Sequence, residues 1–159
     1  MQHDISWARA KVKAFKLPSR VVVHSGIPSE YDHETDEIRI SKHNYLPAAN
    51  ILLIGQDRLM SVAHEVGHAF LAHCRPRGFG SVFGNSRKSY DDAAWSKHRF
   101  MKRPPGFVRS YGTAHPDEDF CDCFAVILTG KRPWIGTDQA LEEKLEFVKK
   151  AVEARLRRR

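Results

Sequence analysis

The amino-acid sequence predicts a small α+β domain in which a short mixed sheet packs on a long helix. Two short segments, 21–24 and 36–41, have the β-branched or alternating composition of strands. Three later segments, 57–74, 117–128 and 138–157, repeat apolar residues at helical spacing. Strands that come before the helices, rather than alternating with them, are typical of the α+β class.

Length and composition agree with one domain over residues 1–159. The 159-residue chain is 42% hydrophobic and 28% charged, as in an ordinary globular domain with a core of its own. It contains no apolar run of the roughly 18 residues that a membrane span requires. Residues 1–15 carry interspersed charges and no apolar stretch like that of a secretion signal. We therefore expect a cytoplasmic protein, or one exported without a cleavable signal peptide.

The first elements are short. A helix is predicted over residues 6–15, and Pro18 ends it. Residues 21–24 read Val-Val-Val-His and are followed by Ser-Gly, which predicts a strand and then a turn. Residues 36–41 alternate polar and apolar side chains, which predicts a second strand with one buried face.

The long helix over residues 57–74 has Asp57 as its expected N-cap. Its apolar stripe is formed by Leu59, Val62, Val66, Ala69 and Phe70. Gly67 lies on the opposite stripe. In the interior of a helix, glycine lowers helix stability by about 1 kcal/mol relative to alanine. This glycine predicts that another part of the molecule approaches the helix closely at that point.

The remaining chain is expected to form a long basic loop and two helices. Residues 75–116 are rich in glycine, proline and basic side chains, with a possible short helix over 91–100 and a break at 104–106. Gly130 and then Pro133 are expected to end the helix over 117–128. The last helix carries an apolar stripe that indicates core packing, made of Leu141, Leu145, Val148, Val152 and Leu156.

The segment His64-Glu65-Val66-Gly67-His68 carries the chemistry of a zinc hydrolase. Histidines four residues apart project from one face of a helix and can bind one metal ion. The glutamate beside the first histidine can serve as a general base. The sequence therefore predicts Zn²⁺ as the cofactor, with His64 and His68 as ligands and Glu65 as the catalytic base.

A catalytic zinc ion requires a third protein ligand. One extended zinc-hydrolase pattern needs glycine at position 71 and histidine at position 74, but this chain has Leu71 and Cys74. His73 lies about 140° around the helix from His68, so it is not expected to share the metal. Glu118 is the better candidate.

Glu118 begins the next predicted helix, and Asp122 follows it one turn later. From that position Asp122 can orient a metal-binding histidine, as a carboxylate often does. The alternative reading of Glu118 is a first-turn carboxylate that the helix dipole favours.

These residues give the chain a resemblance to the gluzincin metallopeptidases. It looks most like the branch that contains the anthrax lethal factor protease domain and small bacterial proteins classed as zinc-binding peptidases. In that branch a tyrosine lies seven residues before the ligand glutamate and an acidic residue lies four after it. Tyr111 and Asp122 match this spacing around Glu118, and residues 115–120 resemble the start of the glutamate helix.

The resemblance implies a zincin-like fold and a function. His64, His68 and Glu118 would bind zinc, Glu65 would be the general base, and Tyr111 would steady the oxyanion, with His115 as the second candidate for that role. The strand over 37–41 would border the cleft, where a peptide could pair with it. The predicted substrate is a peptide or protein.

Charge and cysteine content leave two alternatives. The net charge of +7, with basic residues concentrated in 75–109 and 155–159, could favour nucleic acid, although no nucleic-acid-binding motif accompanies it. One alternative is thus a nucleic-acid-associated zincin-like module. The other is a non-catalytic, zinc-stabilised interaction domain. The three cysteines, Cys74, Cys121 and Cys123, do not form a disulfide framework and are expected to be small buried residues.

Overall fold

A computed structural model of the chain describes residues 2–25, 29–42, 58–84, 105–132, 136 and 138–158. The helices are α1 (Gln2–Ala14), α3 (Arg58–Cys74), α6 (Pro116–Thr129) and α7 (Gln139–Arg157), with a short π-helix, η2 (Gly80–Gly84), and a 3-10 helix, η3 (Ser110–Ala114). The strands are β1 (Arg20–His24), β2 (Glu30–Asp32) and β3 (Glu37–Ser41). The α+β class that the sequence predicts is confirmed.

The three strands form a small mixed sheet in the order β1-β3-β2. β1 runs parallel to β3, with Val21 opposite Ile38, and β2 runs antiparallel to β3, with Tyr31 opposite the same Ile38. β3 is therefore the central strand, and the expectation that the strand over 37–41 borders the cleft is wrong. The sequence analysis missed β2, because a strand of three residues is too short to show an alternating pattern.

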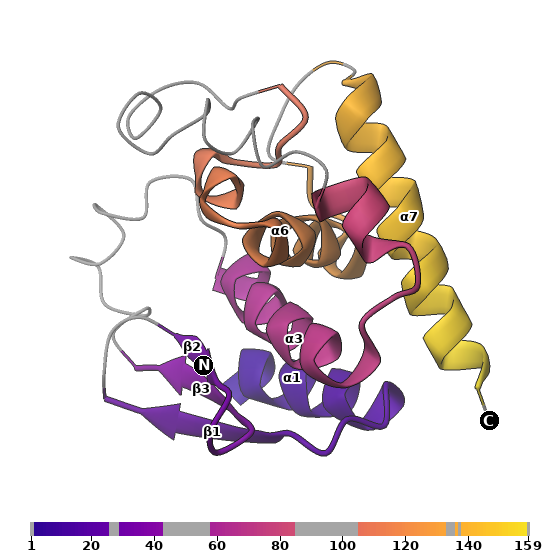
Figure 1. The fold of residues 1–159 in the computed structure, drawn as a ribbon. Helices are drawn as coiled ribbons and strands as arrows, with labels where there is room; N and C mark the ends of the chain where they lie inside the picture. Colours follow the sequence, from indigo (N-terminus) through magenta and orange to yellow (C-terminus); the bar gives the residue numbers. More distant parts are fainter. Residues whose placement is uncertain are drawn as a thin grey trace.

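The motif helix α3 runs through the middle of the molecule. Figure 1 shows α1 and the sheet on one side of α3, α6 on the other side, and α7 alongside α6. Phenylalanine rings fill the space between these layers: Phe70 of α3 lies 5.4 Å from Phe15 and 5.1 Å from Phe124, measured between ring centroids. The site helix is thus held by packing on both sides.

α6 approaches α3 closely at Gly67. A Cβ placed on Gly67 would lie 3.1 Å from the Sγ atom of Cys121 and 3.2 Å from its Cα atom. The close approach that this glycine predicts is confirmed, and the neighbour is the backbone of the helix that carries Glu118. Any larger residue at position 67 would push the two helices apart.

The ends of α6 and α7 follow the sequence signals. Gly130 adopts the left-handed conformation at φ 69°, and its backbone N–H donates to the Val126 carbonyl, which ends α6. Asp138 begins α7 by accepting a hydrogen bond from the Leu141 backbone N–H. Four of the five residues in the predicted stripe of α7 are buried, whereas Leu156, near the end of the helix, is 50% exposed.

Some expectations concern residues that the structure does not describe. These are the Asp57 cap, the possible helix over 91–100 and the role of Pro133. α1 begins earlier than predicted, and η2 and η3 were not predicted at all. Within the described ranges, no helix is long and apolar enough to cross a membrane.

Candidate metal centre

Three side chains from two helices meet at one point. The His64 Nε2 atom lies 2.8 Å from Glu118 Oε2 and 3.2 Å from His68 Nε2, and the His68 Nε2 atom lies 3.4 Å from Glu118 Oε2. Ligands bound to one tetrahedral zinc ion at about 2.0–2.1 Å are roughly 3.3 Å apart. The triangle that these atoms form is therefore of the size a zinc ion needs.

The local structure explains why the three atoms converge. His64 and His68 are one turn apart on α3, with ring centroids separated by 4.9 Å. Glu118 lies in the first turn of α6, one turn before Cys121, and Cys121 is the residue that packs on Gly67. The close crossing of the helices thus brings the carboxylate to the two imidazoles.

Cys121 is a competing third donor. Its Sγ atom and one nitrogen of each histidine all lie within 4.8 Å of one another. Glu118 is favoured because its Oε2 atom lies 2.8 and 3.4 Å from the two histidine nitrogens, close to the spacing of ligands on one zinc ion. It also lines the open cleft, whereas Cys121 is fully buried and burial raises the pKa of its thiol well above the ordinary value. A catalytic metal ion needs an open position, and among the described residues Glu118 borders such an opening, the cleft.

Asp122 contacts His64, which is where the predicted orienting role would place it. Its Oδ1 atom lies 2.8 Å from His64 Nδ1, and both side chains are buried. If Nδ1 carries the proton, it donates to the carboxylate and leaves the Nε2 lone pair directed at the ligand triangle. Burial alone would lower the pKa of His64, but hydrogen bonds with Asp122 and Glu118 raise it to about 9. A metal ion held by Nε2 would take the place of the proton at that atom.

Arg109 is the site residue that the sequence analysis missed. Its Nε atom donates to Asp122 Oδ1 at 2.7 Å, and its guanidinium lies 5.2 Å from the ring centroid of Tyr111. Burial raises the pKa of the Asp122 carboxyl, but the charge of Arg109 and the contact with His64 lower it below its usual value. The sequence offered only an indirect signal for Arg109. A buried carboxylate such as Asp122 requires a cation nearby, and several basic residues precede α6 in the chain.

Glu65 and Tyr111 line the cleft beside this triangle. The cleft has a volume of about 490 Å³, and its other walls come from Ser29, Glu30, Tyr31, His33, Ser61 and Arg109. Glu65 is buried, and that burial raises the pKa of its carboxyl above the ordinary glutamate value despite the nearby histidines.

The Tyr111 ring lies 5.9 Å from the His64 ring, measured between centroids. Burial, followed by the charges of Glu118 and Glu65, raises the pKa of the Tyr111 hydroxyl. Tyr111 therefore keeps its proton near neutral pH and can donate a hydrogen bond.

The other predicted histidines lie outside the cleft. His115 is the N-cap of α6, where its Nδ1 atom accepts a hydrogen bond from the Asp117 backbone N–H at 3.2 Å, and it is not among the described residues that line the cleft. His73 contacts Asp36, with 3.0 Å between Nε2 and Oδ1, so it faces away from the ligand triangle as expected. Cys123 is buried and Cys74 is half-buried.

The fold and the site together define a small α+β domain whose candidate metal centre opens into a cleft. Residues 44–150 match the family described as putative zinc-binding metallo-peptidase. Since the match covers more than half of the chain, and includes both histidines and Glu118, the chain belongs to this family. No curated protein and no solved structure gave a match.

Proposed function

We propose that this protein is a zinc-dependent peptidase of the gluzincin type, in which His64, His68 and Glu118 hold the metal ion. The observation that carries the proposal is the triangle of Nε2, Nε2 and Oε2 atoms with sides of 2.8 to 3.4 Å, at the floor of an open cleft. When bound, zinc supplies Lewis-acid chemistry, which polarises a carbonyl and acidifies a water molecule. The family match supports zinc binding and a protein substrate.

Glu65 has the position and the chemistry of the general base. It precedes the second ligand histidine by one turn of α3 and lines the same cleft. A carboxyl whose pKa is raised by burial accepts a proton more readily than an exposed one. In the proposed reaction Glu65 takes a proton from the attacking water and passes it to the leaving amine.

Tyr111 is proposed to stabilise the oxygen of the attacked carbonyl group. Its phenol is protonated and borders the cleft beside His64. The Arg109 guanidinium lies over its ring and fixes its position. A hydrogen-bond donor held in advance at this point is worth more than one that must be ordered during the reaction.

The substrate is proposed to be a peptide that lies along β2. β2 is the strand at the cleft edge of the sheet, and Glu30 and Tyr31 line the cleft. An extended peptide can add to such an edge through its backbone groups. β2 therefore takes the place of β3 as the proposed docking strand, because both edges of β3 are already paired with β1 and β2.

A non-catalytic, zinc-stabilised domain is the second candidate. Such a site needs no general base, because structural zinc sites are closed by four protein ligands. Glu65 lines an open cleft here, and within the described residues the three atoms of His64, His68 and Glu118 converge at distances that fit the ion. These observations favour the peptidase.

The test combines metal analysis with turnover. Purified wild-type protein and Glu65→Gln are expected to contain about one zinc ion per chain. Wild type cleaves a mixed peptide library, as measured by mass spectrometry, and Glu65→Gln does not. The matched control is Glu143→Gln on the exposed face of α7, which should behave like wild type. Full activity of Glu65→Gln would exclude the proposed mechanism, and wild type that binds no zinc after reconstitution would exclude the metal centre.

A further inference from the structure

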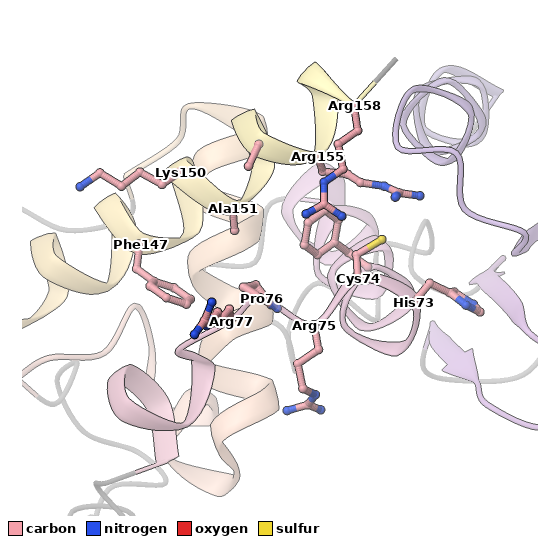
Figure 2. A pocket seen from close by; sticks show the side chains of 12 residues that line it. His73, Cys74, Arg75, Pro76, Arg77, Phe147, Lys150, Ala151, Arg155 and Arg158 are labelled. Atoms are coloured by element: carbon pink, nitrogen blue, oxygen red, sulfur yellow. The ribbon is translucent and has the colours of Figure 1, made fainter.

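A second pocket lies between the end of α3 and the helix α7. It has a volume of about 570 Å³ and shares no lining residue with the cleft. Figure 2 shows that its walls come from residues 73–77 on one side and from α7 on the other. The volume is in the range of about 300–1,000 Å³ that is usual for small-molecule sites.

The pocket is strongly basic. Five cations line it, and no carboxylate does: Arg75, Arg77, Lys150, Arg155 and Arg158. They come from two segments that are far apart in the sequence, so the fold places them together. Cations gathered in this way create a positive field that a bound anion would relieve.

Several of these cations are available to a ligand. Within the residues that the structure describes, the guanidinium groups of Arg77 and Arg158 have no hydrogen bond or ion pair. Arg155 is held in place, because its Nε and Nη2 atoms donate to the carbonyls of Phe15 and Lys16 at 2.7 and 3.1 Å. Arg75, by contrast, is already paired with Asp117, at 3.1 and 2.8 Å. The wall therefore combines one fixed guanidinium with two that are free to move.

The pocket also offers an apolar surface. One stripe of α7 faces it, made of Phe147, Lys150, Ala151, Ala154 and Arg155, and Arg158 follows directly after the helix. This stripe is distinct from the buried stripe of the same helix, which packs into the core. The Phe147 ring is half-buried and is held by an edge contact with Phe83, with 5.9 Å between ring centroids. A flat apolar group can therefore pack on Phe147 while charges contact the arginines.

We propose that this pocket binds a compact polyphosphate ligand with a flat apolar moiety, that is, a nucleoside di- or triphosphate. A terminal phosphate group carries about −1.5 to −2 charges at pH 7, so a di- or triphosphate concentrates several charges in a small volume. Guanidinium groups bind phosphate in a bidentate manner, and four of the five cations are arginines. A nucleic-acid strand or an acidic peptide spreads single charges along an extended chain and is a poorer match to five cations gathered around one pocket of about 570 Å³.

The experiment compares two double variants that remove the same charge from the same stretch of chain, which is α7 and its C-cap Arg158. Lys150→Gln with Arg158→Gln removes two lining cations, whereas Lys149→Gln with Arg157→Gln removes two exposed cations next to them that do not line the pocket. ATP binding to full-length protein is measured by isothermal titration calorimetry. We expect the lining pair to weaken binding at least about tenfold and the adjacent pair to change it less than about twofold.

Two further variants locate the ligand. Arg77→Gln, on the opposite wall, should also weaken ATP binding. His33→Ala, in the cleft but outside the ligand triangle, should bind ATP as wild type does, which separates this pocket from the cleft. Thermal melts of all variants check that each is folded.

Three outcomes would overturn the proposal. Equal weakening by both pairs would mean that only the overall charge matters. No ATP binding at millimolar concentration would exclude a nucleotide. Tight binding of an acidic peptide or an oligonucleotide that depends on Lys150 and Arg158, without ATP binding, would assign the pocket to a macromolecular partner instead.

Discussion

The backbone of Cys121 lies directly against Gly67, so that a Cβ at position 67 would be 3.2 Å from the Cys121 Cα atom. Because the contact is with backbone, rotation of a side chain cannot relieve it. In an open helix, replacing glycine with alanine would stabilise the protein by about 1 kcal/mol. Here the two helices must separate instead.

We therefore expect Gly67→Ala to lower the free energy of unfolding by about 1–3 kcal/mol, as measured by urea denaturation. Gly80→Ala is the control, because a Cβ at position 80 has no neighbour within 4 Å. It should change stability by less than about 0.5 kcal/mol. A Gly67→Ala protein as stable as wild type would contradict the close crossing of α3 and α6.

Glu118→Ala is expected to lose most of its zinc. The mutation removes one corner of the ligand triangle and leaves two histidines, too few for a stable site. Asp117→Ala is the matched control, since Asp117 lies next to Glu118 in the same first turn but pairs with Arg75. Elemental analysis after dialysis gives the answer. Zinc retained in Glu118→Ala would point to Cys121, which the double variant Glu118→Ala with Cys121→Ser would test.

Asp122→Asn is expected to weaken zinc binding by about 10- to 100-fold without removing a ligand. The amide oxygen can still accept from His64 Nδ1 and Arg109 Nε, but it carries no charge, so both hydrogen bonds weaken and the Arg109 guanidinium loses its counter-ion. Competition with a fluorescent chelator measures the affinity. An unchanged affinity would show that Asp122 does not orient His64. Asp119→Asn is a poor control because Asp119 is buried and pairs with Lys144, so the exposed Asp117→Asn serves better.

Tyr111→Phe is expected to lower kcat by about 10²-fold and to leave zinc content and KM nearly unchanged, because a lost oxyanion donor acts only in the transition state. Tyr111 is 41% exposed, so the change should not affect folding. The measurement is steady-state cleavage of a peptide identified in the library. His115→Ala is the comparison, and it is expected to reduce only the stability of α6, since His115 caps that helix. If His115→Ala lost more kcat than Tyr111→Phe, His115 rather than Tyr111 would be the oxyanion donor.

Asp36 is expected to give the protein a stability that is lost in acid. Burial alone would raise the pKa of its carboxyl, but hydrogen bonds from Ser19, His73 and Tyr31 lower it below the ordinary value. A carboxyl with a lowered folded-state pKa stabilises the protein above its unfolded-state pKa, and this contribution disappears as the pH falls through the folded-state value. Thermal melts should therefore show that wild type exceeds Asp36→Asn in Tm at pH 7, and that the gap closes below about pH 4. A constant gap over that range would contradict the role of the charge.

The sequence predicted the elements whose signals are local. The spacing of His64 and His68, the apolar stripe of α7 and the glycine at the end of α6 each lie within one element, and the structure has all three. It also brings Glu118 to the two histidines, while the catalytic roles of these residues stay predictions.

Arrangements that depend on distant segments could not be predicted. The central position of β3 depends on β2, which is too short to show a pattern. Arg109 was one basic residue among many, because its contact with Asp122 exists only after η3 has folded onto α6. The basic pocket likewise depends on how α7 packs beside the segment after α3.

Glu118 follows His64 by 54 positions in the chain. An ion that binds His64, His68 and Glu118 would close this stretch into a loop, much as a disulfide bond would, and would remove conformational freedom from the unfolded chain. Metal loading and folding would then be a single linked equilibrium. A chelator would act on such a protein as a denaturant, and resistance to proteolysis would rise and fall with the supply of the ion.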